Sequence, residues 1–285
     1  MALLTKEIID LFKKQKIVIK KPGENIKIED LVGPGFNPTY PLSGKREGIL
    51  VFGLNPAGDE SEAAEERKPE FFPLNYIDST GVVDKKLLRN RSWGYFHSIM
   101  DAFNDVCRSF EVNENVKWDW MNLDEQTLSA RLHNDGWGEL DVRTILSEYK
   151  KKSSANYTIY IGDLFYVHET SSNNLFKWLN IKDSDKALSS VYKQYIQDMF
   201  QQHIDELLNN NVNLKFIYIN NAKASKLINN NVFGGGYESY KTYSYGSDGS
   251  KKEIPVFFGG MLSNGVTDVF ARDRLIKEIQ NICHI

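Results

Sequence analysis

Cysteine is scarce in this sequence. The 285 residues include only two, Cys107 and Cys283, and they have neither the spacing of a metal-binding motif nor the number that a disulfide framework needs. This excludes a small disulfide-stabilised fold and a zinc module of the Cys-x-x-Cys type. The scarcity is typical of proteins in a reducing compartment. We therefore expect a cytoplasmic protein without a metal site.

Long hydrophobic runs are also missing. No apolar stretch approaches the roughly 18 residues that are needed to cross a bilayer, and the first residues lack the pattern of a signal peptide. We therefore expect no membrane partner.

The sequence also has no excess of positive charge. The chain has 35 Lys and Arg against 38 Asp and Glu, a formal net charge of −3. A nucleic-acid contact must then come from a local basic patch. An acidic run at 59–66 favours a small ligand instead. The basic residues that would favour DNA are Lys85, Lys86, Arg89, Arg91 and Arg272.

Four short apolar segments are the main structural signal. They lie at 48–52, 157–161, 214–219 and 255–258, and each ends in a small or polar loop that precedes a helical pattern. This alternation predicts an α/β fold, a three-layer α/β/α arrangement with a central, mostly parallel, four-stranded sheet. At 285 residues we expect a single domain spanning 1–285.

The helices and the connecting segments complete this expectation. Apolar periodicity predicts helices near 3–12, 128–149 and 188–208, and Asp268 is positioned to cap a last helix. Residues 1–45 are interpreted as a first helix and a linker. Residues 229–250, rich in Asn, Gly, Ser and Tyr, are interpreted as a flexible or hairpin-like excursion.

The stretch that organises the chain is the first apolar segment with the loop after it, Gly53-Leu54-Asn55-Pro56. Because Pro56 restricts the backbone of Asn55, the amide side chain is expected to stand on a stiff loop at the carboxyl end of a strand. Open α/β sheets bind their ligands at this end. Polar residues follow the other three segments in the same way: Asp163, Asn221, Ser263 and Asn264.

At these positions the chain resembles the uracil-DNA glycosylase superfamily. The tetrapeptide Gly53-Leu54-Asn55-Pro56 is similar to the Gly-x-Asn-Pro first motif of the mismatch-specific and single-strand-selective branches. The segment 256–279 stands where that family has its second motif. The similarity of arrangement covers roughly 48–282, and only the first motif is close in sequence.

The resemblance implies roles for individual residues. Asn55 would orient the hydrolytic water, and Asp163 would stand where the family reads the base. The reaction needs no cofactor, and we expect a monomer acting on single- or double-stranded DNA with a flipped base. The remaining residues expected to bind substrate are Gly53, Leu54, Pro56, Phe71, Phe72, Tyr76, Phe165 and Asn221. Those expected to contact DNA are Ser263, Asn264, Gly265 and Arg272.

The second motif departs from the family pattern. Family members open it with His-Pro-Ser or Asn-Pro-Ser, whereas this chain has Gly259-Gly260-Met261-Leu262-Ser263. The residue that would stabilise the leaving base is therefore missing from its usual place, and His168 is a candidate substitute. Asp163 also replaces the more common Asn, and a carboxylate would hinder the departure of an anionic base unless it is protonated.

Three functions follow from these observations. The first is a DNA N-glycosylase that hydrolyses the bond to uracil or another modified base. The second is a catalytically silent protein of the same fold that binds a nucleobase, a nucleotide or nucleic acid. The third is an unrelated α/β enzyme.

Overall fold

The computed structural model describes residues 5–15, 17, 19–20, 37–38, 47–55, 125–134, 136, 138–139, 142–143, 157–181, 190–209, 211–246, 251–262 and 267–284. Contacts divide the chain into two compact units. Unit 1 is Met1–Pro38, Gly48–Phe71 and Ile159–Met261; unit 2 is Thr39–Glu47, Phe72–Thr158 and Leu262–Ile285. The single domain expected from the sequence stays a prediction.

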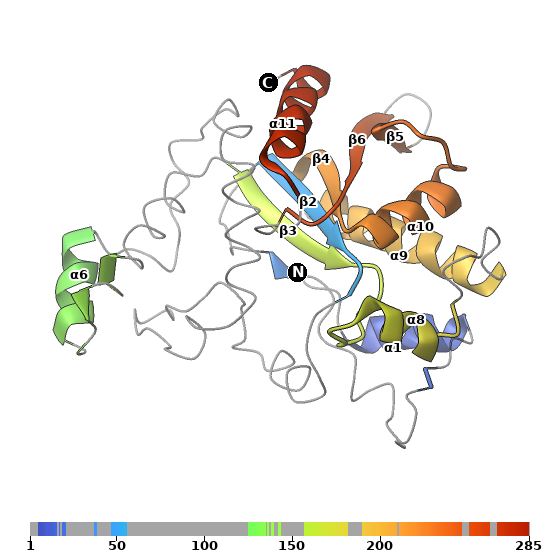
Figure 1. Ribbon diagram of the computed structural model, residues 1–285, viewed down its shortest axis with the longest axis horizontal. Helices are drawn as coiled ribbons and strands as arrows, with labels where there is room; N and C mark the ends of the chain where they lie inside the picture. The colour runs from blue at the N-terminus through green and yellow to red at the C-terminus, as the bar shows by residue number, and fades with distance from the viewer. Residues whose placement is uncertain are drawn as a thin grey trace. The chain divides into compact units, whose positions relative to one another are not determined.

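A mostly parallel sheet forms the centre of the fold (Figure 1). The four apolar segments become its central strands, which confirms the predicted α/β class. In spatial order these are β3 (Tyr157–Asp163), β2 (Glu47–Gly53), β4 (Asn213–Asn220) and β6 (Lys252–Gly259). The parallel pair β4 and β6 sets Asn220 beside Gly259, so the carboxyl ends of these strands lie at the same edge.

Two antiparallel strands at the sheet edges lie outside the four predicted strands. β1 (Asn37–Pro38) pairs with β3, and β5 (Tyr240–Tyr245) pairs with β6. β5 lies inside the segment 229–250, interpreted as a flexible or hairpin-like excursion, and its antiparallel pairing with β6 fits the hairpin-like alternative. Its sequence, YKTYSY, contains no aliphatic residue, and its side chains alternate between half-buried and exposed over most of its length. An edge strand with this composition shows little hydrophobic signal.

Both faces of the sheet are buried. On one face, Leu50, Phe52, Ile217, Ile219 and Val256 belong to the main hydrophobic core together with helix residues. The alternate residues point to the opposite face and are also buried, each at most 1% exposed: Ile49, Val51, Phe216, Tyr218 and Phe257. Because a parallel sheet needs cover on both faces, this pattern agrees with a layered α/β architecture.

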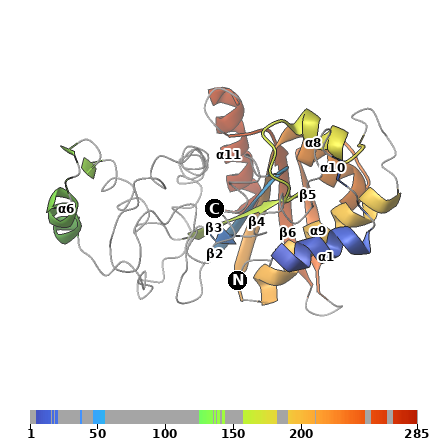
Figure 2. The same cartoon turned by 90° about the horizontal axis from the view of Figure 1, so that it is seen from below.

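Among the described residues, four helices belong to unit 1, and Figures 1 and 2 show them beside the sheet. They are α1 (Thr5–Lys14), α8 (Ser172–Trp178), α9 (Ser190–Asn209) and α10 (Ala222–Val232). α9 supplies the buried stripe that its periodicity predicts, with Tyr195, Met199 and Ile204 all fully buried.

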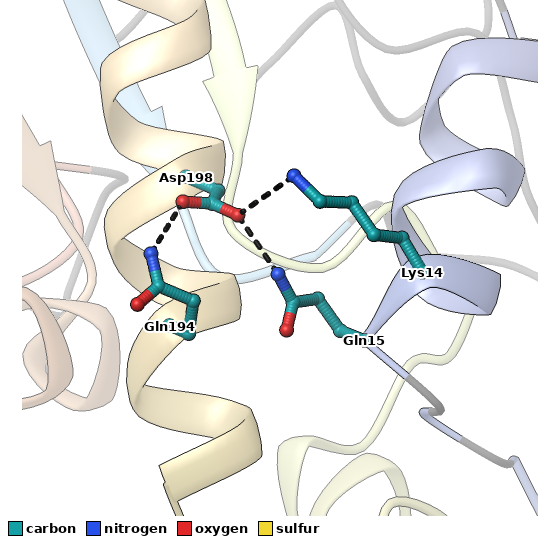
Figure 3. A network of polar contacts seen from close by, with 4 residues as sticks. All are labelled: Lys14, Gln15, Gln194 and Asp198. Carbon is teal, nitrogen blue, oxygen red and sulfur yellow. Dashed lines mark hydrogen bonds and ion pairs between the residues drawn. The ribbon is translucent and has the colours of Figure 1, made fainter.

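The first helix is fixed to α9. Phe12 packs edge-on against Tyr195, with 5.0 Å between ring centroids. Next to this pair, the Asp198 carboxylate accepts hydrogen bonds from Gln15 and Gln194 at 2.8 and 2.7 Å and lies 3.8 Å from the Lys14 ammonium (Figure 3). The predicted amphipathic first helix is therefore confirmed as part of the core of unit 1.

Unit 2 contributes α6 (Glu125–Asn134) and α11 (Val269–Cys283). Asp268 caps α11 as predicted, because its Oδ1 accepts the backbone N–H of Ala271 at 2.9 Å. Across the described ranges, no helix combines the length and the apolar character that a membrane span requires.

The strand order defines the point where a ligand site is expected. From β2 the chain passes to β3 on one side of it, and then to β4 on the other side. Open α/β sheets bind ligands outside the carboxyl ends of the strands at such a reversal. The residues that follow β2 and β4 at this point are Leu54, Asn55 and Asn221.

Candidate functional site

The carboxyl ends of β2 and β3 lie side by side, and their arrows in Figure 1 point to the same edge. The pairing continues past the strands, since the N–H of Leu164 donates to Gly53 O at 3.1 Å and that of Phe165 donates to Leu54 O at 2.8 Å. The two polar loops predicted to share an edge are therefore neighbours.

The Asp163 carboxylate lies against the backbone of Gly53. A Cβ atom built on Gly53 would come closer than 3.0 Å to Asp163 Oδ1, a separation that real Cβ atoms essentially never show. The Asp163 side chain is half-buried. The glycine of the first motif therefore makes room for the carboxylate that the resemblance places at the base.

We expect Gly53→Ala to destabilise the protein by about 1–3 kcal/mol, because the new methyl group overpacks against Asp163. Urea unfolding of both single variants and of the double variant with Asp163→Ala measures the coupling. The contact predicts that Asp163→Ala relieves the penalty by at least about 0.5 kcal/mol. Strictly additive effects would show that the carboxylate does not occupy this position.

Asn55 bridges the loops that follow β2 and β3. Its Nδ2 donates to the carbonyl oxygens of Val167 at 3.2 Å and Glu169 at 2.7 Å. Because a carbonyl only accepts, the nitrogen must face these two atoms. The side-chain orientation is therefore determined, and Oδ1 is the atom through which Asn55 could orient water.

Two predicted site residues have structural roles. Phe165 is expected from the sequence to stack on a base, but its ring is fully buried and stacks on Tyr195, with centroids 5.4 Å apart and planes at 9°. We assign it to the core. Asn221 caps α10, since its Oδ1 accepts from the N–H groups of Lys223 and Ala224 at 2.9 and 3.2 Å. Its oxygen is therefore engaged at the edge where substrate binding is predicted.

The structure does not test the remaining predicted site residues. Arg272 belongs to α11 in unit 2, and its role stays a prediction. The others fall outside the described residues: Pro56, Phe71, Phe72, Tyr76, Ser263, Asn264 and Gly265, as well as the basic residues Lys85, Lys86, Arg89 and Arg91.

The end of β6, where the second motif is expected, is hydrogen-bonded to Tyr218 of β4 and packs against its ring. The Tyr218 hydroxyl donates to Gly260 O at 2.7 Å, and a Cβ on Gly259 would overlap the Tyr218 ring. The absence of a side chain at Gly259 therefore lets the chain pass close to a buried tyrosine. His168, the candidate substitute for the missing histidine, is 1% exposed, so its ring belongs to the protein interior.

The sequence patterns do not predict a buried polar pair next to Asp163, formed by Tyr166 and His203. The Tyr166 hydroxyl hydrogen-bonds His203 Nε2 and also accepts the backbone N–H of Asp163 at 3.0 Å. His203 Nδ1 lies 2.7 Å from Met199 O. The only signal in the sequence is a histidine on the apolar face of α9, which does not identify its partner.

Burial controls the ionisation of this pair. It lowers the pKa of His203 to about 4, although the hydrogen bond to Met199 partly opposes the shift. Burial also raises the pKa of Tyr166 well above its ordinary value, and the negative charge of Asp163 adds to this. Both side chains are therefore neutral at pH 7.

No protein-family model matches the chain, and no curated protein matches it significantly. Within the described ranges, no three His, Cys, Asp or Glu side chains are arranged to hold a metal ion. The class that the structure defines is an α/β protein with polar residues grouped at the carboxyl edge of a mostly parallel sheet.

Proposed function

We propose that the chain is a DNA N-glycosylase that hydrolyses the bond between a modified base and its sugar, with uracil as the substrate that the resemblance implies. The observation that carries the proposal is the orientation of Asn55. Its amide nitrogen is held by Val167 O and Glu169 O at the switch point of the sheet, two residues after Gly53, on which the Asp163 carboxylate lies.

This arrangement suits a reaction that needs little nucleophilic power. When the base departs, positive charge develops on the sugar, and a neutral amide that orients one water molecule is enough for a slow enzyme. Asn55 Oδ1 can accept a hydrogen bond from that water. Asp163 assists departure of the base only as the neutral acid, because a carboxylate repels an anion.

A second candidate is a silent binding protein of the same architecture. The observation that favours it is the end of β6, where Tyr218 holds Gly260 and the family's leaving-group histidine is absent. Such a protein would bind a nucleobase or nucleotide at the same edge without cleaving it.

The experiment is an excision assay on single- and double-stranded oligonucleotides that carry uracil or another modified base. Alkali cleaves the strand wherever an abasic site has formed. The glycosylase proposal expects cleavage at the modified base in at least one substrate. The absence of cleavage throughout the panel, with the same oligonucleotides still bound, would favour the silent binding protein.

A further inference from the structure

We propose that Tyr166 and His203 are positioning residues that hold the turn from Asp163 to Glu169 in place, and with it the side chain of Asn55. The inference rests on the proposed function for its effect on catalysis, whereas the positioning itself can be measured without activity. Hydrogen bonds and ring contacts among described residues support it.

The direction of every hydrogen bond in the pair is determined. Because Met199 O only accepts, His203 Nδ1 must donate to it. In the neutral ring Nε2 is then an acceptor, and the Tyr166 hydroxyl donates to it. The same hydroxyl oxygen accepts the N–H of Asp163 at 3.0 Å. A continuous chain of bonds thus runs from α9 to the backbone of Asp163.

The His203 ring is packed against Gly162, Tyr166 and Phe52. A Cβ on Gly162 would lie 2.6 Å from His203 Cδ2 and 2.8 Å from Nε2, so the ring packs directly on the backbone of β3. Its plane is within 6° of the Tyr166 ring, and the Phe52 ring meets it edge-on at 4.8 Å between centroids. The ring therefore sets the position of the Tyr166 hydroxyl at the end of β3.

The turn that this pair holds also carries the partners of Asn55. Asp163 begins the turn, and the Val167 and Glu169 carbonyls that accept from Asn55 Nδ2 lie four and six residues later. Tyr195 adds a second anchor, since its hydroxyl donates to Leu164 O at 2.9 Å. A displacement of the turn would therefore move both candidate site residues together.

Tyr166→Phe tests the inference because it removes one hydroxyl and keeps the ring. The matched control is Tyr218→Phe, since Tyr218 is equally buried and its hydroxyl donates to Gly260 O outside this turn. The first readout is the side-chain amide resonance of Asn55, assigned from its loss in Asn55→Ala. In Tyr166→Phe we expect this resonance to shift and its hydrogen exchange to become about tenfold faster, with no change in Tyr218→Phe.

The second readout is the excision rate, where the wild type is active. We expect Tyr166→Phe to lower kcat about tenfold with KM within about twofold, because orientation is lost and binding is kept. If the wild type does not excise, the proposed function fails, and the Asn55 resonance still decides the positioning. An Asn55 resonance in Tyr166→Phe identical to that of the wild type would overturn the inference.

A second pair of variants covers the case in which Tyr166→Phe does not fold. His203→Gln keeps an oxygen that can accept from Tyr166, whereas His203→Leu removes every polar atom. We expect the Asn55 resonance and its exchange rate to stay near wild type in His203→Gln and to change in His203→Leu. Equal behaviour of the two variants would contradict a role for the hydrogen bond.

Discussion

Asn55→Ala is expected to lower base excision about 100-fold, the loss typical of removing one oriented hydrogen-bonding group from a catalytic site. The variant loses Oδ1, the atom assigned to the water, and also the two bonds from Nδ2 to Val167 and Glu169. Single-turnover excision measures the loss. Asn213→Ala is the matched control, because Asn213 begins β4 and bonds Lys252; we expect it to keep wild-type activity.

The isosteric change Asn55→Asp distinguishes the proposed role of Asn55 in orienting water from its role in holding the loop. A carboxylate oxygen would replace Nδ2 and face two carbonyl oxygens, an arrangement that is repulsive unless the group is protonated. At pH 7 we therefore expect Asn55→Asp to be less stable than Asn55→Ala, although it keeps an acceptor for water. The difference in stability between Asn55→Asp and Asn55→Ala should shrink as the pH falls toward 4, because the protonated carboxyl group can donate to Glu169 O. Equal stability of the two variants at pH 7 would argue against the observed orientation.

The sequence predicted the part of the fold that depends on local patterns. Each of the four central strands is a short, mostly apolar run closed by Gly, Asn or Asp, and burial on both faces favours apolar residues in such runs. The polar and small residues that end these runs also predicted that Asn55 and Asp163 lie at the same edge of the sheet. The contact of the Asp163 carboxylate with Gly53 was not predictable, because it depends on the register between β2 and β3.

Two features of the site have a common physical origin that local patterns do not contain. Phe165 follows a strand and is a candidate for stacking on a base or for the core, and the chain after β3 buries its ring on Tyr195. The partners Tyr166 and His203 are 37 residues apart, and no local spacing relates them. Both cases depend on how α9 packs on the strand end, which is tertiary information that a periodicity of 3.6 residues does not contain.

Stability is expected to fall by about 3 kcal/mol between pH 6.5 and pH 4 through His203 alone. Its pKa is about 4 in the folded protein and 6.5 in an ordinary environment. As the pH falls through 6.5, the unfolded chain takes up a proton at this residue and the folded protein does not, which favours unfolding. Each unit of difference corresponds to about 1.4 kcal/mol, and the loss is complete once the pH is below about 4.

The measurement is the free energy of unfolding of the wild type and of His203→Gln at several pH values from 7 to 4. All other titrating groups are common to both proteins, so the difference between the two curves isolates His203. We expect this difference to shift by about 3 kcal/mol in favour of the variant as the pH falls. Protonation would also convert Nε2 from an acceptor into a donor and break the bond from Tyr166. A difference that does not change with pH would show that the His203 ring is not buried in its neutral form, and would remove the basis for its hydrogen bond to Tyr166.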